Sequence, residues 1–198
     1  MTSKAEQTAE FIVHKVAPIF NKHGYYGTSM SDLTKATGLT KGAIYGNFKN
    51  KEELAFIAFK HNVDRVVNQI KLELSTKESS VDKLYGLTSF YRRYVNYTHD
   101  YGGCPIVNIG VDANNENAEL LKKVQEVISK LQYYITKMIL VGKEAGEIKE
   151  TVVAEKYGRF FFTLIEGAVF MTTTMKDDIY LQETMDRIDG IIAEELVI

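Results

Sequence analysis

Residues 39–51 read Leu-Thr-Lys-Gly-Ala-Ile-Tyr-Gly-Asn-Phe-Lys-Asn-Lys. Thr40 is a residue type that caps helix starts, and the residues up to Phe48 give about two turns with Ile44 and Phe48 on one face. The other face is small and polar and holds two glycines, each of which costs about 1 kcal/mol relative to alanine in a helix. A close approach of the backbone to phosphates or base edges explains these glycines, and a loosely packed surface turn is the alternative.

The flanking residues predict two further helices. Residues 29–38 have the pattern of a capped short helix that ends at Gly38, and residues 39 and 40 make a two-residue turn. Asn50 with Glu53 three positions later is a capping-box pattern, so another helix starts at Lys51. Two short helices joined by a tight turn form a helix-turn-helix, which indicates a DNA-binding head.

The run from Thr28 to Leu54 resembles the DNA-binding signature of the TetR (tetracycline-repressor-like) regulators. The positions in register are Gly38, Lys41-Gly42, Ile44-Tyr45, Phe48 and Lys51-Glu52-x-Leu54. The resemblance is strong over residues 1–60, and the remainder is similar to the family in length and helical character. It implies a dimeric repressor, less often an activator, that releases DNA when a small molecule binds the C-terminal part.

The resemblance also implies the DNA contacts by position. Thr28 and Ser29 would hold a phosphate at the start of the second helix, and Lys51 would hold another. The residues facing the major groove or its walls would be Lys41, Gly42, Ala43, Tyr45 and Asn47, with Thr40 beside them. The family usually has an aromatic residue or His at the position of Gly46 and His at the position of Asn47, so these two departures bear on the operator sequence.

The composition is that of an ordinary soluble globular chain, with 198 residues, 45% of them hydrophobic and 25% charged. Cys104 is the single cysteine, which excludes an intramolecular disulfide framework, and no secretion signal is seen at the N-terminus, so we expect a cytoplasmic protein. The longest apolar stretch, residues 160–175, is interrupted by Glu166 and is shorter than the roughly 20 residues that a membrane span needs. No membrane partner is expected.

The charge is unevenly distributed along the chain. Residues 1–60 carry eight lysines, no arginine and five acids, a net charge of +3, while residues 61–198 carry 16 bases and 21 acids, a net charge of -5. The basic part is the predicted DNA-binding part. Arginine is the residue that most often reads guanine, and residues 1–60 contain none. We therefore expect sequence discrimination to depend on Lys41, Tyr45, Asn47 and DNA shape.

Motifs for enzyme chemistry are absent from the sequence. There is no Gly-x-Ser-x-Gly elbow, no Gly-x-x-x-x-Gly-Lys phosphate loop and no Gly-x-Gly-x-x-Gly. The four histidines are scattered without ligand spacing, so neither a metal site nor Cys-His catalysis is indicated. We expect no enzyme activity, no metal and no cofactor.

Apolar residues at helical spacing continue to the end of the chain, which predicts an all-α fold of about nine helices. We expect a three-helix helix-turn-helix domain at residues 1–50. Residues 51–198 would form a helical effector-binding and dimerisation domain, with residues 51–75 as a connecting helix and a polar break at residues 76–80. Residues 151–175 are apolar almost all round, so the last two helices are expected to form a four-helix interface in a homodimer, as the resemblance also implies.

A helix that Ser80 caps and that extends to about His99 is rich in aromatic residues, with Tyr101 just beyond it. Such rings are common in cores, but tyrosines also line amphipathic pockets. The candidate pocket residues for an apolar or aromatic effector are Phe90, Tyr91, Tyr94, Tyr97, Asn108, Phe162 and Glu166. For Glu166, the alternative is a carboxylate satisfied by a hydroxyl or by Arg159.

Two functions remain open from the sequence. The first is a ligand-responsive dimeric regulator, a repressor released from a palindromic double-stranded operator by a small molecule. The second is a helical small-molecule-binding or scaffolding protein whose DNA head is degenerate.

Overall fold

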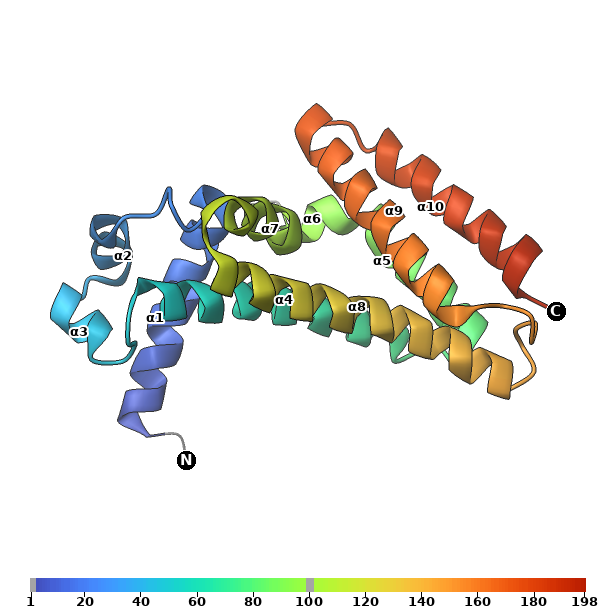
Figure 1. The fold of residues 1–198 in the computed structure, drawn as a ribbon, viewed down its shortest axis with the longest axis horizontal. Coiled ribbons are helices and arrows are strands. Elements are labelled where there is room, and N and C mark those ends of the chain that lie inside the picture. The colour runs from blue at the N-terminus through green and yellow to red at the C-terminus, as the bar shows by residue number, and fades with distance from the viewer. Residues whose placement is uncertain (1–2, 99–101) are drawn as a thin grey trace. The chain divides into compact units, whose positions relative to one another are not determined.

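The computed structural model describes residues 3–98 and 102–198. These residues form ten α-helices, against about nine expected, and confirm the all-α fold with its N-terminal helix-turn-helix. The first five are α1 Lys4–His23, α2 Met30–Thr37, α3 Lys41–Tyr45, α4 Lys51–Leu74 and α5 Ser80–Arg92. The others are α6 Tyr94–Thr98, α7 Pro105–Glu116, α8 Ala118–Glu144, α9 Ala154–Met175 and α10 Ile179–Ile191, followed by a π-helical turn, η2, at Ile192–Leu196 (Figure 1).

The chain divides into two compact units. Unit 1 contains the described residues of 1–66 and 98–125, and unit 2 contains residues 67–97 and 126–198. Helices α4 and α8 each supply residues to both units. The domain boundary predicted between residues 50 and 51 coincides with the start of α4, and it stays a prediction.

Reciprocal caps fix the starts of α1 and α2. The hydroxyl of Ser3 accepts the Glu6 N–H at 3.2 Å, and the Glu6 carboxylate accepts the Ser3 N–H at 2.6 Å. Ser29 and Asp32 make the same arrangement at the start of α2. Helix α2 ends at Gly38, whose φ of 69° lies in the left-handed region that glycine adopts without steric cost. The predicted capped start and glycine end of α2 are confirmed.

A hydrophobic core joins α1, α2, α3 and the start of α4 in unit 1. It includes Ile12, Val16, Phe20, Leu33, Ile44, Phe48, Leu54 and Ala58. Ile44 and Phe48 both lie in this core, as predicted, and are 0% and 5% exposed. They anchor α3, so the opposite face of this short helix points outward.

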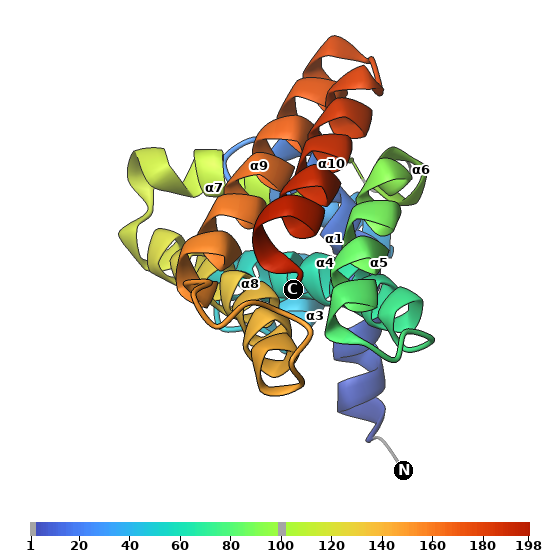
Figure 2. The ribbon, with the colours of Figure 1, turned by 90° about the vertical axis from the view of Figure 1, so that its right-hand side faces the viewer.

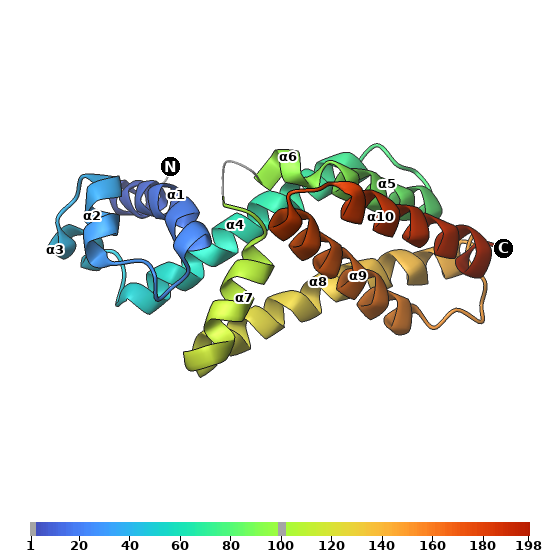
Figure 3. The same cartoon turned by 90° about the horizontal axis from the view of Figure 1, so that it is seen from above.

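In unit 2, α10 packs against both α9 and α5, and α9 and α10 lie side by side (Figure 2 and Figure 3). Helix α9 also approaches α8 closely at Gly158, where an added Cβ would lie 2.1 Å from the Thr136 hydroxyl oxygen. Glycine is therefore needed there because of packing. Among the described residues, no helix is both long and apolar enough to cross a membrane.

Two details of the aromatic helix differ from the prediction. Its cap is Ser79, whose hydroxyl accepts the Asp82 N–H at 2.9 Å, whereas the predicted cap, Ser80, is buried. The predicted helix to His99 is also divided at Arg93, whose N–H bonds to the Phe90 carbonyl at 3.1 Å. His99 and Tyr101 lie outside the described residues.

Candidate DNA interface and ligand cavity

Helix α3 presents an exposed face that its own core does not use. The Thr40 hydroxyl caps the helix by accepting the Ala43 N–H at 3.2 Å. Lys41, Gly42 and Ala43 are exposed, whereas Ile44 is buried. The first turn of α3 is thus available to an external partner.

The two glycines near α3 are not required by the packing of the protein. Within the described part of the chain, a Cβ on Gly42 would meet only the Thr40 hydroxyl oxygen, at 3.9 Å. A Cβ on Gly46 would make ordinary contacts of 3.4 and 3.5 Å with the carbonyl oxygens of Gly42 and Ala43. Gly46 has a φ of -69°, which any residue adopts. Both positions have room for a side chain, so glycine leaves the backbone open toward the outside.

Helix α3 ends earlier than predicted, at Tyr45 instead of Phe48. The Asn47 amide donates to the Ala43 carbonyl at 2.9 Å and so closes the end of the helix with a side chain. Glycine at position 46 adds to this because it has a low helix propensity. The Lys41 ammonium lies 5.8 Å from the centre of the Tyr45 ring, which places these two side chains together on the exposed side.

The side chains of Thr28 and Ser29 are hydrogen-bonded within the protein. Thr28 is 1% exposed and donates to the Gly24 carbonyl at 2.7 Å. The Ser29 hydroxyl donates to the Asp32 carboxylate at 2.6 Å, and this hydrogen bond is the main reason why the pKa of Asp32 lies below its usual value. These side chains therefore shape the start of α2, where the Ser29 hydroxyl already accepts the Asp32 N–H, so a phosphate there would use other backbone N–H groups of the first turn.

Lys51 contacts the connection between α1 and α2 and stabilises it. Its ammonium donates to the Tyr25 carbonyl at 2.6 Å and lies 4.4 Å from the centre of the Tyr25 ring. Burial lowers the pKa of Lys51, and the nearby Asp112 and Asp32 act in the opposite direction. Lys51 is held by the protein beside the α2 start.

Within unit 1, helix α7 contacts the end of α1 and the connection between α1 and α2. The Asn108 amide donates to the carbonyl oxygens of Asn21 at 2.9 Å and Gly102 at 2.7 Å. The Asp112 carboxylate accepts the Tyr25 N–H at 2.5 Å. Asn108, which the sequence suggested for the effector, thus lies in the unit that contains α3 and stabilises the end of α1.

Replacement of Asp112 by alanine is expected to destabilise unit 1 by about 1 to 3 kcal/mol, because the part-buried Tyr25 N–H loses its acceptor. Native-state hydrogen exchange would report the loss as faster exchange of the Tyr25 amide. Asp178→Ala is the matched control, since Asp178 makes no side-chain cap for α10. Equal exchange at Tyr25 in the Asp112→Ala protein and the wild type would contradict this role.

Unit 2 contains a cavity of about 310 Å³. Its lining comes from α4, α5, α8 and α9 and is mainly apolar, with Ile70, Leu87, Ile135 and Ile165 among its residues. The volume is at the lower end of the roughly 300–1,000 Å³ of small-molecule sites. All lining residues belong to unit 2.

Two of the seven residues suggested for the effector line this cavity, and the effector site stays a prediction. Tyr91 and Phe162 line the cavity. Phe90 is 1% exposed. Its ring stacks on Tyr97 with ring centres 5.1 Å apart and also packs against the ring of Tyr94. Glu166 is half-buried on α9, next to the lining residue Ile165.

Three lining residues that sequence reasoning missed are lysines: Lys71 on α4, Lys83 on α5 and Lys137 on α8. Each stands within an amphipathic helix, where a lysine beside apolar residues is ordinary. Only the packing of three helices brings them to one cavity, so no local sequence signal marked them.

The side of α5 away from the cavity is tied to α10. Arg92 donates to the carboxylates of Asp186 at 2.7 Å and Asp189 at 2.6 Å. The Thr88 hydroxyl donates to Asp189 at 2.6 Å, and the Gln182 amide donates to the Arg92 carbonyl at 3.0 Å. Helix α5 therefore contacts the cavity through Tyr91 and fixes α10 through its next residues.

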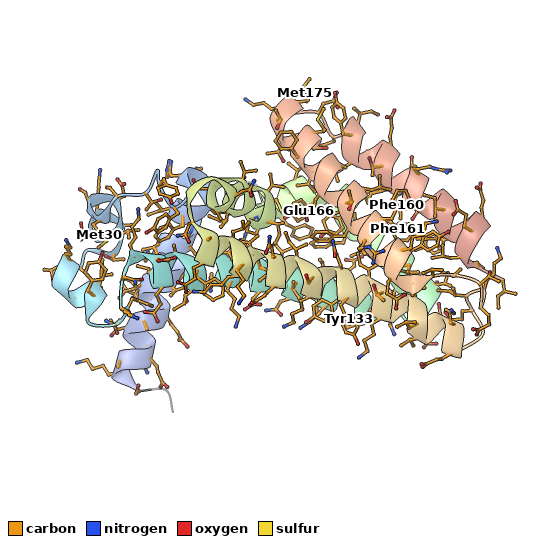
Figure 4. The ribbon with its side chains drawn as sticks, viewed as in Figure 1. Met30, Tyr133, Phe160, Phe161, Glu166 and Met175 are labelled. Carbon is orange, nitrogen blue, oxygen red and sulfur yellow. The ribbon has the colours of Figure 1, made fainter. Side chains whose placement is uncertain are left out.

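Helix α9 carries large apolar side chains that the chain leaves exposed. Phe160, Phe170, Met171 and Met175 are between 37% and 55% exposed. Figure 4 shows Phe160 near the beginning of α9 and Met175 at its end. These four side chains, here called the α9 stripe, give an apolar surface on which another protein chain can pack.

A helix-turn-helix head and a helical part with an apolar cavity define a DNA-binding transcriptional regulator. Residues 15–56 match the family model described as bacterial regulatory proteins, tetR family, and residues 80–188 match the tetracyclin repressor-like C-terminal domain. The chain belongs to the TetR family of transcriptional regulators.

Individual relatives agree with this assignment. A TetR-family transcriptional regulator from Cytophaga hutchinsonii is 31% identical, with a TM-score of 0.90 over 98% of this chain and 96% of its own. The fatty acid metabolism regulator protein of Bacillus subtilis (strain 168) is 23% identical over 85% of this chain and 84% of its own. The HTH-type transcriptional repressor DhaR of Mycobacterium sp. (strain GP1) is 23% identical over 95% of this chain and 91% of its own.

Proposed function

We propose that the protein is a homodimeric cytoplasmic repressor that leaves a palindromic DNA operator when a small molecule binds the cavity of unit 2. The observation that carries the DNA part is the outward face of α3, with Lys41, Gly42 and Ala43 exposed above a buried Ile44. The name of the Mycobacterium relative supports repression over activation.

In this proposal α3 is the recognition helix. Lys41, Tyr45 and Asn47 contact base edges and groove walls, while Gly42 and Ala43 let the backbone come close. Phosphates are bound by backbone N–H groups at the starts of α2 and α3. The residues around these helix starts are Thr28, Ser29, Thr40 and Lys51. In a dimer, the two α3 helices enter successive major grooves about 34 Å apart.

The exposed apolar stripe of α9 supports dimerisation. Phe160, Phe170 and Met171 are large and apolar, and burial of such surface is the main driving force of association. Helix α10 lies beside α9, so two copies would pack these four helices together. The dimer places one α3 on each half-site.

The cavity and the head share helix α4. Leu54 and Ala58 of α4 belong to the core of unit 1, whereas Val67 and Ile70 of the same helix line the cavity. A ligand that binds more tightly to one arrangement of α4 than to another changes the position of α3 for DNA. By linkage, DNA lowers the affinity for the ligand by the same factor.

Selection of bound sequences from a random duplex pool tests the proposal. The wild type is expected to enrich a palindrome, whereas Lys41→Ala and Tyr45→Ala lose the enrichment and the control Lys60→Ala, an exposed lysine of α4, retains it. Binding should also weaken steeply with salt. Salt-dependent binding without sequence preference would instead favour a helical small-molecule-binding protein with a degenerate head.

A further inference from the structure

The cavity of unit 2 combines apolar walls with positive charge. Lys71, Lys83 and Lys137 come from α4, α5 and α8, and no aspartate or glutamate is among the lining residues. The remaining polar lining residues are one serine and two tyrosines. The lining thus carries three positive charges and no negative one.

The positive charge of the cavity lining differs in sign from the net charge of the unit that contains it. Unit 2, residues 67–97 and 126–198, carries 13 bases and 16 acids, a net charge of -3. Three other cations of unit 2 have acidic partners: Arg92 pairs with Asp186 and Asp189, Arg93 lies 3.0 Å from Glu73, and Lys143 lies 3.9 Å from Glu150. Across residues 3–98 and 102–198, none of the ion pairs involves a lysine of the cavity.

The Lys83 ammonium makes a long hydrogen bond within the protein. This ammonium lies 3.5 Å from the carbonyl oxygen of Glu78, a long distance for a hydrogen bond. A lysine can place its methylene groups on apolar surface and leave its ammonium in water, and this accounts for any one of the three. Lys71 and Lys137 are exposed and Lys83 is half-buried, so their charged ends can meet the charged end of a ligand whose apolar part lies in the cavity.

We propose that the cavity binds a small amphipathic carboxylate, with its apolar body between the helices and its carboxylate at Lys71, Lys83 and Lys137. The apolar lining matches the body, and the three ammonium groups match the charge. The cavity of about 310 Å³ equals the volume of roughly ten waters in the liquid, which suits a medium-length alkyl chain or a small aromatic ring system. This ligand class rests on the ligand-responsive function proposed above.

Calorimetric titration of the full-length protein with decanoate, decan-1-ol and decyltrimethylammonium tests the charge requirement. Decanoate is expected to bind about tenfold or more tightly than the neutral alcohol, because charge contacts of modest strength add up over the lysines. The cationic probe is expected to bind worst. The triple variant Lys71→Gln, Lys83→Gln, Lys137→Gln should lose the preference for decanoate and keep its affinity for the alcohol.

Lys122→Gln is the matched control, since Lys122 is an exposed lysine of α8 that lies outside the cavity lining. It should bind all three probes as the wild type does. Equal binding of decanoate and decan-1-ol, a triple variant with unchanged decanoate affinity, or no binding of any probe would overturn the proposed ligand class.

The same protein samples separate this inference from the proposed function. Adding decanoate to the protein bound to the operator duplex obtained from the selection measures whether the ligand releases the DNA. Tight, lysine-dependent decanoate binding with the duplex still bound would support the carboxylate site and contradict release by this site. Sequence-specific DNA binding without decanoate binding would overturn the ligand class alone.

Discussion

Replacement of Phe170 by aspartate is expected to convert the proposed dimer into folded monomers and to weaken binding to the proposed operator by about a hundredfold or more. Phe170 is 49% exposed on α9, so aspartate is tolerated in the isolated chain. In the proposed dimer the same position lies between two copies, where a carboxylate loses its water without gaining a partner. A monomer carries one α3 and loses the advantage of binding two half-sites together.

Sedimentation velocity and operator titration measure the two effects, and circular dichroism reports whether the chain remains helical. Leu72→Asp is the matched control, because Leu72 is also a large exposed apolar residue, 67% exposed, but belongs to α4 and not to α9. It should remain dimeric and bind DNA as the wild type does. A Phe170→Asp protein that is still dimeric would show that α9 is not the interface.

The sequence predicted those parts of the fold that local chemistry determines. The predicted cap of α2 is formed by Ser29 with Asp32, three residues apart, and it is present. Gly38 ends α2 because the left-handed conformation is easy only for glycine. The burial of Ile44 and Phe48 followed from helical spacing alone.

Features that depend on packing were not predictable. Asn108 binds the carbonyl of Asn21, 87 residues away, and a polar residue in an apolar stretch cannot reveal which distant group it meets. The cavity requires four helices to leave space between them, and its lysines are ordinary within each helix. The close approach of Gly158 to Thr136 is likewise set by the contact of two helices.

The ends of helices were missed where neighbouring residues offer equivalent signals. Ser79 and Ser80 are both able to cap a helix, and the structure selects Ser79 while Ser80 is buried. The break at Arg93 has neither glycine nor proline beside it to mark it. The Asn47 amide shortens α3 by taking the Ala43 carbonyl, a contact that competes with helix continuation.

Replacement of Gly42 by alanine is expected to change stability and DNA affinity in opposite senses. Alanine favours a helix over glycine by up to about 1 kcal/mol, and a Cβ at position 42 lies 3.9 Å from the nearest Thr40 atom. The free energy of unfolding should therefore rise or stay the same. If α3 brings its backbone against DNA at Gly42, the same methyl group occupies that space, and operator affinity should fall by about tenfold or more.

The opposite signs make this variant informative, because a loss of binding in a protein that is equally or more stable cannot be ascribed to unfolding. Gly110→Ala in α7 is the control, since its Cβ would make an ordinary 3.7 Å contact with Val124 and lies outside α3. It should bind the operator as the wild type does. Denaturant titration and operator titration of both variants give the comparison. Unchanged operator affinity in Gly42→Ala would mean that glycine at this position does not serve the approach to DNA, and recognition would then rest on the Lys41 and Tyr45 side chains.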